Sequence, residues 1–386
     1  MQSMSESQPT IRINNLDITH YKGIKHLHIE FPSPVMDYDP DILVIGSKNG
    51  LGKTSILECA MLLLIFLDEE NKQFRIQQRR THTTVDIPDL LIHGGEEEAV
   101  ISGEIEQSER SDKEKDKTGF KTVIIKLSIH IRRDGTISVS RTPTLLSVRE
   151  NLCTNSGRGY AYDQRDNIPD DFYRFLQIIS GFDQNPLISE MYLFFHSYRK
   201  VMEGNPELGQ MISDDSLGMI RPLKQSSKMS SFKLTILRMM MSQADLFESG
   251  TAISNENDAF SVLNNLMEIY AGGKISKLRP SKDNTIDIRI KPLTDEESYS
   301  FDGLSSGQKE MISTLFMIWN TTWKNPAVVF IDEPELHLNT GWHRNFVHKL
   351  LELVPDNQYI ISTHSEDVMA SVKKDNRLLI LEQDLN

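Results

Sequence analysis

The feature that most limits what this chain can fold into is a glycine-rich turn between an apolar run and a helical pattern. The apolar run ends at Ile45, and the turn and helix start read Gly46-Ser-Lys-Asn-Gly-Leu-Gly-Lys-Thr-Ser55. A short apolar run of this kind is typical of a buried strand. Backbone N–H groups in such a turn, with the N-terminus of the following helix, can surround phosphate groups. The pattern therefore favours an α/β fold that binds a nucleotide over an unrelated α/β protein with a glycine-rich turn.

The individual residues of this turn predict a P-loop for ATP and Mg²⁺. Lys53 is placed to contact the β- and γ-phosphates, and the hydroxyl of Thr54 is placed to bind Mg²⁺. The strict pattern has glycine where this chain has Ser47, and serine is small enough for the loop to close. The residues predicted to bind nucleotide are Ser47, Lys48, Asn49, Gly50, Gly52, Lys53, Thr54 and Ser55.

A second apolar run ends in two carboxylates and predicts further catalytic chemistry. Val328 to Ile331 read as a buried strand, which places Asp332 at its carboxyl end. Asp332 can then hold Mg²⁺, directly or through water, and Glu333 can orient and deprotonate the attacking water. The alternative is a strand that ends in an acidic turn, and it does not explain why the pair shares a chain with a P-loop.

Two further motifs fit the same chemistry. Leu304-Ser-Ser-Gly-Gln308 opens a predicted helix, and a helix N-terminus with serine hydroxyls binds phosphate. Alone, this motif would be an ordinary serine N-cap. Beside a P-loop, it is explained by contact with nucleotide bound to another subunit. Ile360-Ile-Ser-Thr-His364 reads as a strand ending in a histidine that can hydrogen-bond the γ-phosphate and the attacking water.

Together, and in this order, the motifs resemble those of an ABC-type ATPase head of the soluble SMC/RecF/OLD-like group. The sequence from Ile13 to Ile24 is similar to that group's first strand pair. The run Asp332-Glu-Pro-Glu-Leu-His-Leu-Asn339 is similar to the pattern of OLD-like ATPases and of PtuA-like ATPase subunits of bacterial anti-phage defence systems. The resemblance covers both ends of the chain.

This resemblance implies an α/β fold, a P-loop ABC-ATPase head with mixed β-sheets in two lobes and a helical insertion. It implies one discontinuous ATPase domain, with an N-terminal lobe at residues 1–145, a helical insertion or arm at 146–284 and a C-terminal lobe at 285–386. From about Leu145 to Gly273 the pattern is helical and irregular. No sustained heptad repeat occurs, so we expect no long coiled coil.

The resemblance also implies a dimer that encloses nucleotide between two heads. ATP bound at Lys53 of one head would be capped by Ser305, Ser306 and Gly307 of the other, and His337 to Asn339 would couple the two sites. The catalytic residues are then Lys53, Glu333 and His364, with Thr54 and Asp332 as Mg²⁺ ligands. The family's glutamine between the lobes has four candidates here, Gln73, Gln77, Gln78 and Gln177.

The composition indicates the cellular compartment of the protein and restricts the partners that it can bind. The 42 Lys and Arg residues and 55 Asp and Glu residues give a net charge of −13. This excludes a uniformly basic protein that coats nucleic acid, and leaves room for a local basic patch. Two cysteines cannot build a disulfide framework. The N-terminus lacks a signal-like apolar segment, and the longest apolar run, Ala60 to Leu67, is too short to span a membrane, so we expect a cytoplasmic protein.

These observations predict an ATP-binding and ATP-hydrolysing switch that controls a separate effector in anti-phage defence. We expect a homodimer, or a larger oligomer built from it. Only 22 residues follow His364, too few for the TOPRIM nuclease of longer OLD-like proteins, so a nuclease or toxin would be a partner chain. If nucleic acid is the target, the contact would be indirect, through a basic partner, or would use a small local patch. The alternative is a RecF- or SMC-like DNA-repair ATPase that binds DNA directly, while the motifs disfavour a transporter subunit.

Overall fold

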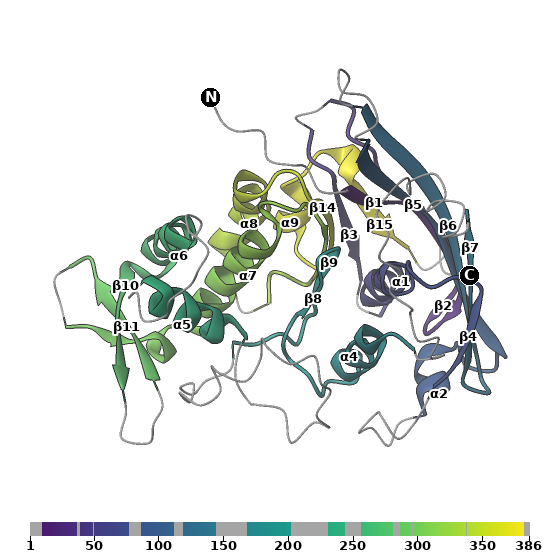
Figure 1. Cartoon of the computed structure of the whole chain (residues 1–386), viewed down its shortest axis with the longest axis horizontal. Helices are drawn as coiled ribbons and strands as arrows, with labels where there is room; N and C mark the ends of the chain where they lie inside the picture. Colours follow the sequence, from purple (N-terminus) through teal and green to yellow (C-terminus); the bar gives the residue numbers. More distant parts are fainter. Residues whose placement is uncertain are drawn as a thin grey trace, which may run out of the picture. The chain divides into compact units, whose positions relative to one another are not determined.

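Two compact units make up the chain in the computed structural model (Figure 1). The first comprises residues 1–198, 321–335 and 340–386, and the second comprises residues 199–320 and 336–339. The structure describes residues 10–36, 39–48, 50–76, 86–111, 119–143, 168–201, 231–243, 256–280, 286–294, 297–336 and 338–381. No helix among these residues is long and apolar enough to cross a membrane.

The first unit contains a largely parallel sheet that carries three of the predicted motifs. Its strand order is β15-β3-β14-β13-β9-β8, and every neighbouring pair is parallel except β8 and β9. The strands are β3 (Ile42–Ser47), β8 (Leu187–Ile188), β9 (Tyr192–Phe195), β13 (Val328–Asp332), β14 (Gln358–Thr363) and β15 (Arg377–Ile380). Every residue of β9, β13 and β14 is buried, as central strands of a parallel sheet require.

The same unit contains an antiparallel sheet of order β2-β1-β5-β6-β7-β4. Its strands are β1 (Thr10–Tyr21), β2 (Ile24–Glu30), β4 (Lys72–Arg75), β5 (Glu98–Ser111), β6 (Gly119–Arg132) and β7 (Thr136–Thr142). Buried side chains alternate with more exposed ones along β7 and from Leu27 to Glu30 of β2, so the apolar residues of these stretches gather on one face of the sheet.

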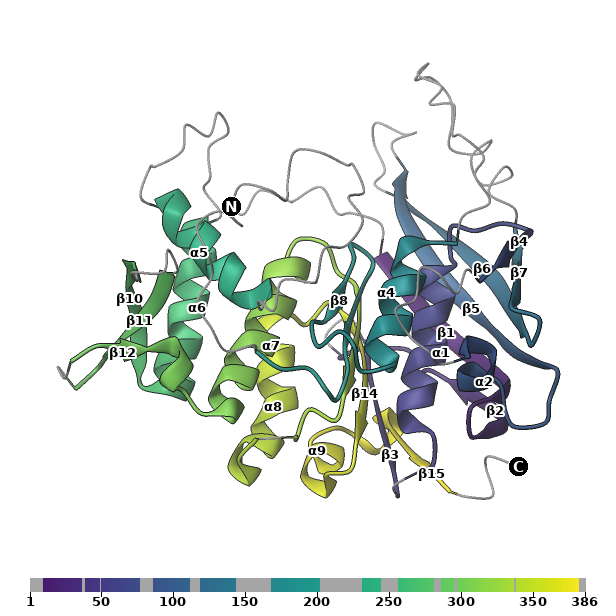
Figure 2. The same cartoon turned by 90° about the horizontal axis from the view of Figure 1, so that it is seen from below.

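Helix α1 (Lys53–Ile65) packs against strands of both sheets (Figure 2). All its residues except Thr54 are buried. A helix that is apolar all round has to be buried, and from Ile56 to Ile65 the only charged side chain is Glu58. The P-loop is therefore joined directly to a helix that is fixed by packing on all sides. The unit also contains α2 (Ile87–Leu91), α4 (Asp170–Ile179), α8 (Thr340–Leu353), α9 (Glu366–Ala370) and η4 (Lys374–Asn376).

The second unit combines helices with a small antiparallel sheet of order β10-β11-β12. Its helices are α5 (Ser231–Gln243), α6 (Glu256–Ala271), η3 (Phe301–Gly303) and most of α7 (Ser306–Thr322), and its strands are β10 (Gly273–Pro280), β11 (Ile286–Pro292) and β12 (Tyr299–Ser300). Helix α6 packs against β10, because the apolar side chains of the sheet need a partner on one face.

The expected α/β head with mixed sheets is confirmed, and no long coiled coil occurs among the described residues. The division at residues 145 and 284 stays a prediction. The described part of 146–284 is not only helical, since β8 and β9 join the parallel sheet and β10 joins the small sheet. Strand β9 was not expected, because a run of four apolar residues has no period of its own, and its pairing with β13 makes it a strand.

Candidate nucleotide-binding site

Three neighbouring parallel strands bring the predicted residues to one edge of the sheet. The P-loop follows β3, Glu333 follows β13 and His364 follows β14. Asp332 is paired with Ser362, and Thr363 is paired with Gly46, so the three strands end at nearly the same level. Since ligands bind outside the carboxyl ends of strands in open α/β sheets, this edge is the candidate site.

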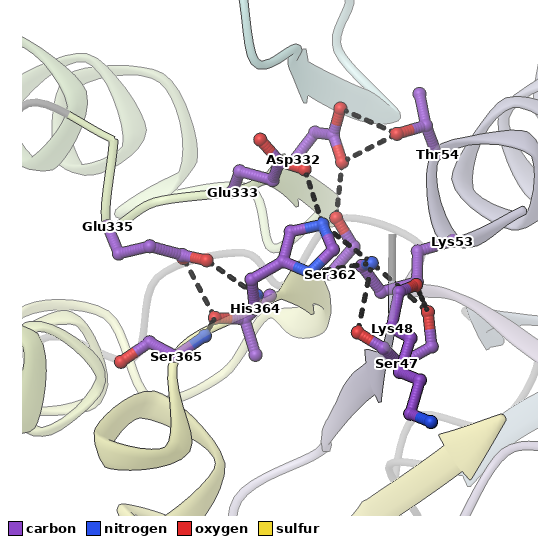
Figure 3. A network of polar contacts seen from close by, with 11 residues as sticks. Ser47, Lys48, Lys53, Thr54, Asp332, Glu333, Glu335, Ser362, His364 and Ser365 are labelled. Carbon is purple, nitrogen blue, oxygen red and sulfur yellow. Dashed lines mark hydrogen bonds and ion pairs between the residues drawn. The ribbon is translucent and has the colours of Figure 1, made fainter. Parts of the chain in front are cut away.

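Thr54 and Asp332 are in direct contact although 278 positions separate them (Figure 3). The Thr54 hydroxyl lies 3.0 and 3.1 Å from the two carboxylate oxygens of Asp332. Asp332 is fully buried and also accepts a hydrogen bond from the Ser362 hydroxyl. Hydroxyl and carboxylate oxygens are the donor set that Mg²⁺ prefers, so these residues fit the predicted metal.

Lys53 points at His364. Its Nζ lies 2.8 Å from Nε2 of His364 and 3.1 Å from the Ser47 hydroxyl. Lys53 is only 5% exposed. This burial lowers the pKa of Lys53, while the nearby carboxylates, Glu333 first among them, act in the opposite direction. A buried cation at this edge is what a triphosphate requires.

Glu333 has an unusual backbone for its residue type. Its φ is +48°, in the left-handed region that non-glycine residues rarely adopt. Its N–H donates to the carbonyl of Ser362 over 3.0 Å, and its carboxylate lies 3.1 Å from Nε2 of His364. Burial, and then the charge of Asp332, raise the pKa of Glu333. Strained residues with raised carboxyl pKa values are frequent at functional sites.

Glu335 also belongs to this network, although we predicted no catalytic role for it from the sequence. Its carboxylate accepts hydrogen bonds from the backbone N–H of His364 at 2.6 Å and from the hydroxyl of Thr363 at 2.8 Å (Figure 3). Glu335 thus fixes the turn that carries the histidine. The signal was present in the Glu-Pro-Glu repeat, where the second carboxylate follows the first by one proline.

The rest of the P-loop has the geometry of a tight turn. Gly50 and Gly52 have φ values of +82° and +74°, which glycine adopts without strain. The Ser47 hydroxyl donates to the carbonyl of Lys48 over 2.7 Å, and Ser55 is buried in α1. Four of the predicted residues lie outside the described residues, namely Asn49, Gln77, Gln78 and His337.

The signature motif lies in the second unit, at the N-terminus of α7. Ser305 and Gln308 form a reciprocal cap. The Ser305 N–H donates to the Gln308 side-chain oxygen over 2.9 Å, and the Gln308 N–H donates to the Ser305 hydroxyl over 3.3 Å. Gly307 is buried, while Ser305 and Ser306 are exposed. The N-cap role of Ser305 is therefore real, and contact of the two serines with phosphate stays a prediction.

The remaining candidates are not joined by the network in Figure 3. Gln73 lies on β4 and pairs with Ser138, and Gln177 lies in the last turns of α4. Among the described residues, no group of histidine, cysteine and carboxylate side chains has the arrangement of a separate metal site.

Residues 242–369 match the family model of the AAA ATPase domain. The match covers about a third of the chain, so this segment is similar to an ATPase domain. The matched segment holds the signature motif, Asp332, Glu333 and His364. The P-loop precedes it, and its contacts with Asp332 and His364 make it part of the same site.

Two curated proteins are similar over short stretches. The retron Vc95 probable ATPase of Vibrio cholerae serotype O1 biovar El Tor is 30% identical over 120 residues, covering 28% of this chain and 23% of that protein. An uncharacterized protein of Mycobacterium tuberculosis is 32% identical over 75 residues, covering 19% of this chain and 8% of that protein. The match spans less than a quarter of either relative.

Solved structures of SMC heads are similar over nearly the whole chain. The SMC head bound to the C-winged helix domain of ScpA is 16% identical, with 95% of this chain and 96% of that chain covered and a TM-score of 0.46. The SMC head domain from Thermotoga maritima is 14% identical, with 94% and 92% covered and a TM-score of 0.41. Because both scores are below 0.5, the fold assignment rests on the strand order and the placement of the motifs.

Proposed function

We propose that the chain is an ATP-binding and ATP-hydrolysing switch whose site is the edge shown in Figure 3. The observation that carries this proposal is the direct contact of Lys53 with His364 and of Thr54 with Asp332. These contacts join motifs from opposite ends of the sequence. A buried lysine, paired carboxylates and a histidine then face the place where the P-loop would hold the phosphates.

The roles of the side chains follow from their chemistry. Thr54 and Asp332 would hold Mg²⁺, which neutralises phosphate charge when bound. Lys53, already desolvated, would contact the β- and γ-phosphates. Glu333 would take the proton of the attacking water, because its raised pKa makes it a stronger base than an exposed glutamate. Glu335 would position His364 without touching substrate.

A single proton at Nε2 of His364 links nucleotide binding to catalysis. Lys53 can donate only to an unprotonated Nε2, whereas a hydrogen bond to the Glu333 carboxylate needs a protonated one. Both partners lie near that atom, at 2.8 and 3.1 Å. When phosphate draws the Lys53 ammonium away, Nε2 no longer has to accept, and the imidazole can exchange its Nδ1 proton for one at Nε2 through solvent. Nε2 can then donate to Glu333 or to the γ-phosphate. Nucleotide binding would thus complete the catalytic arrangement.

We further propose that two ATP-bound heads pair through the signature serines and that the paired state controls a separate effector. Support comes from the exposed Ser305 and Ser306 at the N-terminus of α7, where backbone N–H groups favour phosphate. The resemblance to PtuA-like subunits, together with the relative named as a retron ATPase, supports a cytoplasmic role in anti-phage defence with a nuclease or toxin as effector.

Two variants test the nucleotide site. Lys53→Ala should abolish binding of a fluorescent ATP analogue, because it removes the cation that faces the phosphates. Glu333→Gln should keep that binding, lower phosphate release by roughly 10²–10⁴-fold, and hold the protein as a dimer in ATP when mass is measured by light scattering. Glu352→Gln, an exposed carboxylate on α8, is the matched control and should behave as wild type.

The opposite result in either variant would contradict a different part of the proposal. Unchanged ATP affinity in Lys53→Ala would reject the site itself, and wild-type turnover in Glu333→Gln would reject only the role given to that carboxylate. Purification of the tagged protein from its native host tests the effector, which should co-purify in ATP. The RecF- or SMC-like alternative instead predicts no effector chain and a rate of ATP hydrolysis that DNA changes directly.

A further inference from the structure

The two long strands of the small sheet carry a concentration of positive charge in an acidic protein. Residues 273–292 contain six Lys or Arg residues and two Asp residues, a net charge of +4, whereas the whole chain has a net charge of −13. This segment includes β10 and β11. The pairing of the two strands decides whether these cations are scattered or share one surface.

Five of the cations share one face of the sheet. On β11, Ile286, Ile288 and Ile290 are buried, so Asp287, Arg289 and Lys291 between them point to the opposite face. Residues directly paired across an antiparallel ladder lie on the same face, and these three pair with Arg279, Lys277 and Lys274 respectively. The cationic face is thus made of Lys274, Lys277, Arg279, Arg289 and Lys291, with Asp287 among them.

A β-bulge at Ser276 is what places the cations of β10 together. In an unbroken strand Lys274 would share a face with residues 276 and 278, and Lys277 would lie on the buried face with Ile275. The register instead shifts between Ile275 and Lys277, which inserts one residue and reverses the alternation. The extra residue is held in place, since the Ser276 hydroxyl donates to the carbonyl of Arg289 over 3.2 Å.

Carboxylates offset only part of this charge. Arg289 pairs with Asp287 at 3.2 Å and is only 17% exposed. Lys274 pairs with Glu268 and remains half exposed. Lys277 and Arg279 are exposed, and neither has a carboxylate within ion-pair distance among the described residues. Neighbouring cations on such a face are about 5–7 Å apart, so the face attracts an anion that carries many charges in a row.

We propose that the cationic face binds the phosphate backbone of nucleic acid. A polyphosphate chain contacts several of these cations at once and releases a counterion for each. No aromatic side chain lies on this face among the described residues, so the contacts available are with the phosphates rather than with stacked bases. Binding should therefore be independent of base sequence and strongly dependent on salt. DNA and RNA, single- or double-stranded, share this chemistry.

The test measures fluorescence anisotropy of labelled single-stranded DNA, double-stranded DNA and RNA of random sequence, from 50 to 200 mM NaCl. The variant is the double charge reversal Lys277→Glu/Arg279→Glu. The control is Lys126→Glu/Lys373→Glu, with the same change in net charge at side chains that are 70% and 69% exposed elsewhere. For the wild type, a plot of the logarithm of the association constant against the logarithm of the salt concentration should have a slope near −3. For the variant, the slope should be weaker by about 2, and the affinity should be at least about tenfold lower.

The control should lose less than about threefold in affinity, because the long-range effect of net charge is screened. Phosphate release without nucleic acid should stay at the wild-type rate in both proteins, which separates this face from the ATP site. The proposal is wrong if no nucleic acid binds at 50 mM NaCl or if the variant and the control lose affinity equally. It is also wrong if polyglutamate, or vesicles that contain phosphatidylserine, displace the labelled nucleic acid as effectively as unlabelled nucleic acid does.

Discussion

Burial away from water explains the shifted pKa values of the individual site residues. Burial lowers the pKa of Lys53 and raises the pKa of Glu333, so their values move toward each other. Shifted pKa values of this kind are frequent at functional sites. The left-handed backbone of Glu333 and its hydrogen bond to the Ser362 carbonyl hold the carboxylate in place. This geometry suits the role that we propose for Glu333.

The pH dependence of turnover should report the raised pKa of Glu333. A general base must be deprotonated, so kcat should fall as the pH decreases through the pKa of that carboxyl group. Because burial and Asp332 raise this pKa, the acid limb of the kcat profile should lie above the ordinary glutamate value of 4.5. The measurement is phosphate release at saturating ATP across pH. A limb at or below that value would contradict the assignment.

Replacement of Glu335 should separate positioning from binding. Glu335→Ala removes both acceptors that fix the His364 turn, so we expect kcat to fall by about 10–100-fold while KM for ATP changes little. Glu335→Gln keeps one acceptor and should recover part of the rate. It also removes a negative charge that raises the pKa of Glu333, so the acid limb should move to lower pH. A loss of rate without this movement would indicate a purely structural role.

The sequence located most of this site because its chemistry is tied to local motifs. Lys53 and Thr54 follow the turn after β3, and Asp332 and Glu333 lie at the end of β13. Glu335 could not be assigned in the same way, since its role depends on donors from β14 and the turn after it. Such a contact between distant segments has no local pattern. The contact of Lys53 with His364 was likewise not predictable, because the sequence assigned both residues to phosphate.

At the scale of secondary-structure elements, an ion pair between the partly exposed Lys22 and the buried Glu58 joins the turn between β1 and β2 to helix α1. Lys22 lies 2.6 Å from the carboxylate of Glu58, which also accepts a hydrogen bond from the Tyr21 hydroxyl at 3.0 Å. Burial raises the pKa of Glu58 in spite of this cation. Glu58 is one helical turn beyond Thr54, so the pair ties the antiparallel sheet to the helix that carries the P-loop.

Loss of Lys22 should therefore destabilise the first unit. Lys22→Met leaves the buried Glu58 without its ion partner, and we expect a loss of about 3 kcal/mol in the free energy of unfolding, measured in urea. The double variant Lys22→Met/Glu58→Gln should recover much of this loss, because no buried charge remains. Lys126→Met, which removes an exposed lysine from β6, should cost less than about 1 kcal/mol. Equal losses in the two single variants would contradict the coupling.

The sequence also predicted the long elements better than the short ones. Strands β3, β13 and β14 were expected, since each is a continuous apolar run before a motif. The short strands β8, β9 and β15 lie toward the two edges of the same sheet, and their pairing depends on neighbours that are distant along the chain. The bulge at Ser276 could not be predicted from the sequence either, because it is defined by the register of β10 with β11 and not by a local pattern.

Charge is distributed unevenly over the whole molecule. The chain is acidic, with a net charge of −13, but residues 273–292 have a net charge of +4. A polyanion is repelled by most of such a protein and attracted by one part of it, so the encounter is oriented as well as dependent on salt. The acidic composition therefore excludes a general coating of nucleic acid, and it is compatible with contact through one small sheet.

Pairing of two molecules can be tested by complementation. If the signature serines complete the site of a partner subunit, Lys53→Ala and Ser306→Arg should each be inactive alone, for different reasons. After subunit exchange, a mixed dimer contains one site with an intact Lys53 and an intact Ser306, so a 1:1 mixture should regain roughly a quarter of the wild-type rate. Phosphate release by the mixture measures this directly. A mixture that stays inactive, while light scattering shows that the subunits exchange, would place the signature and the P-loop of one active site in the same molecule.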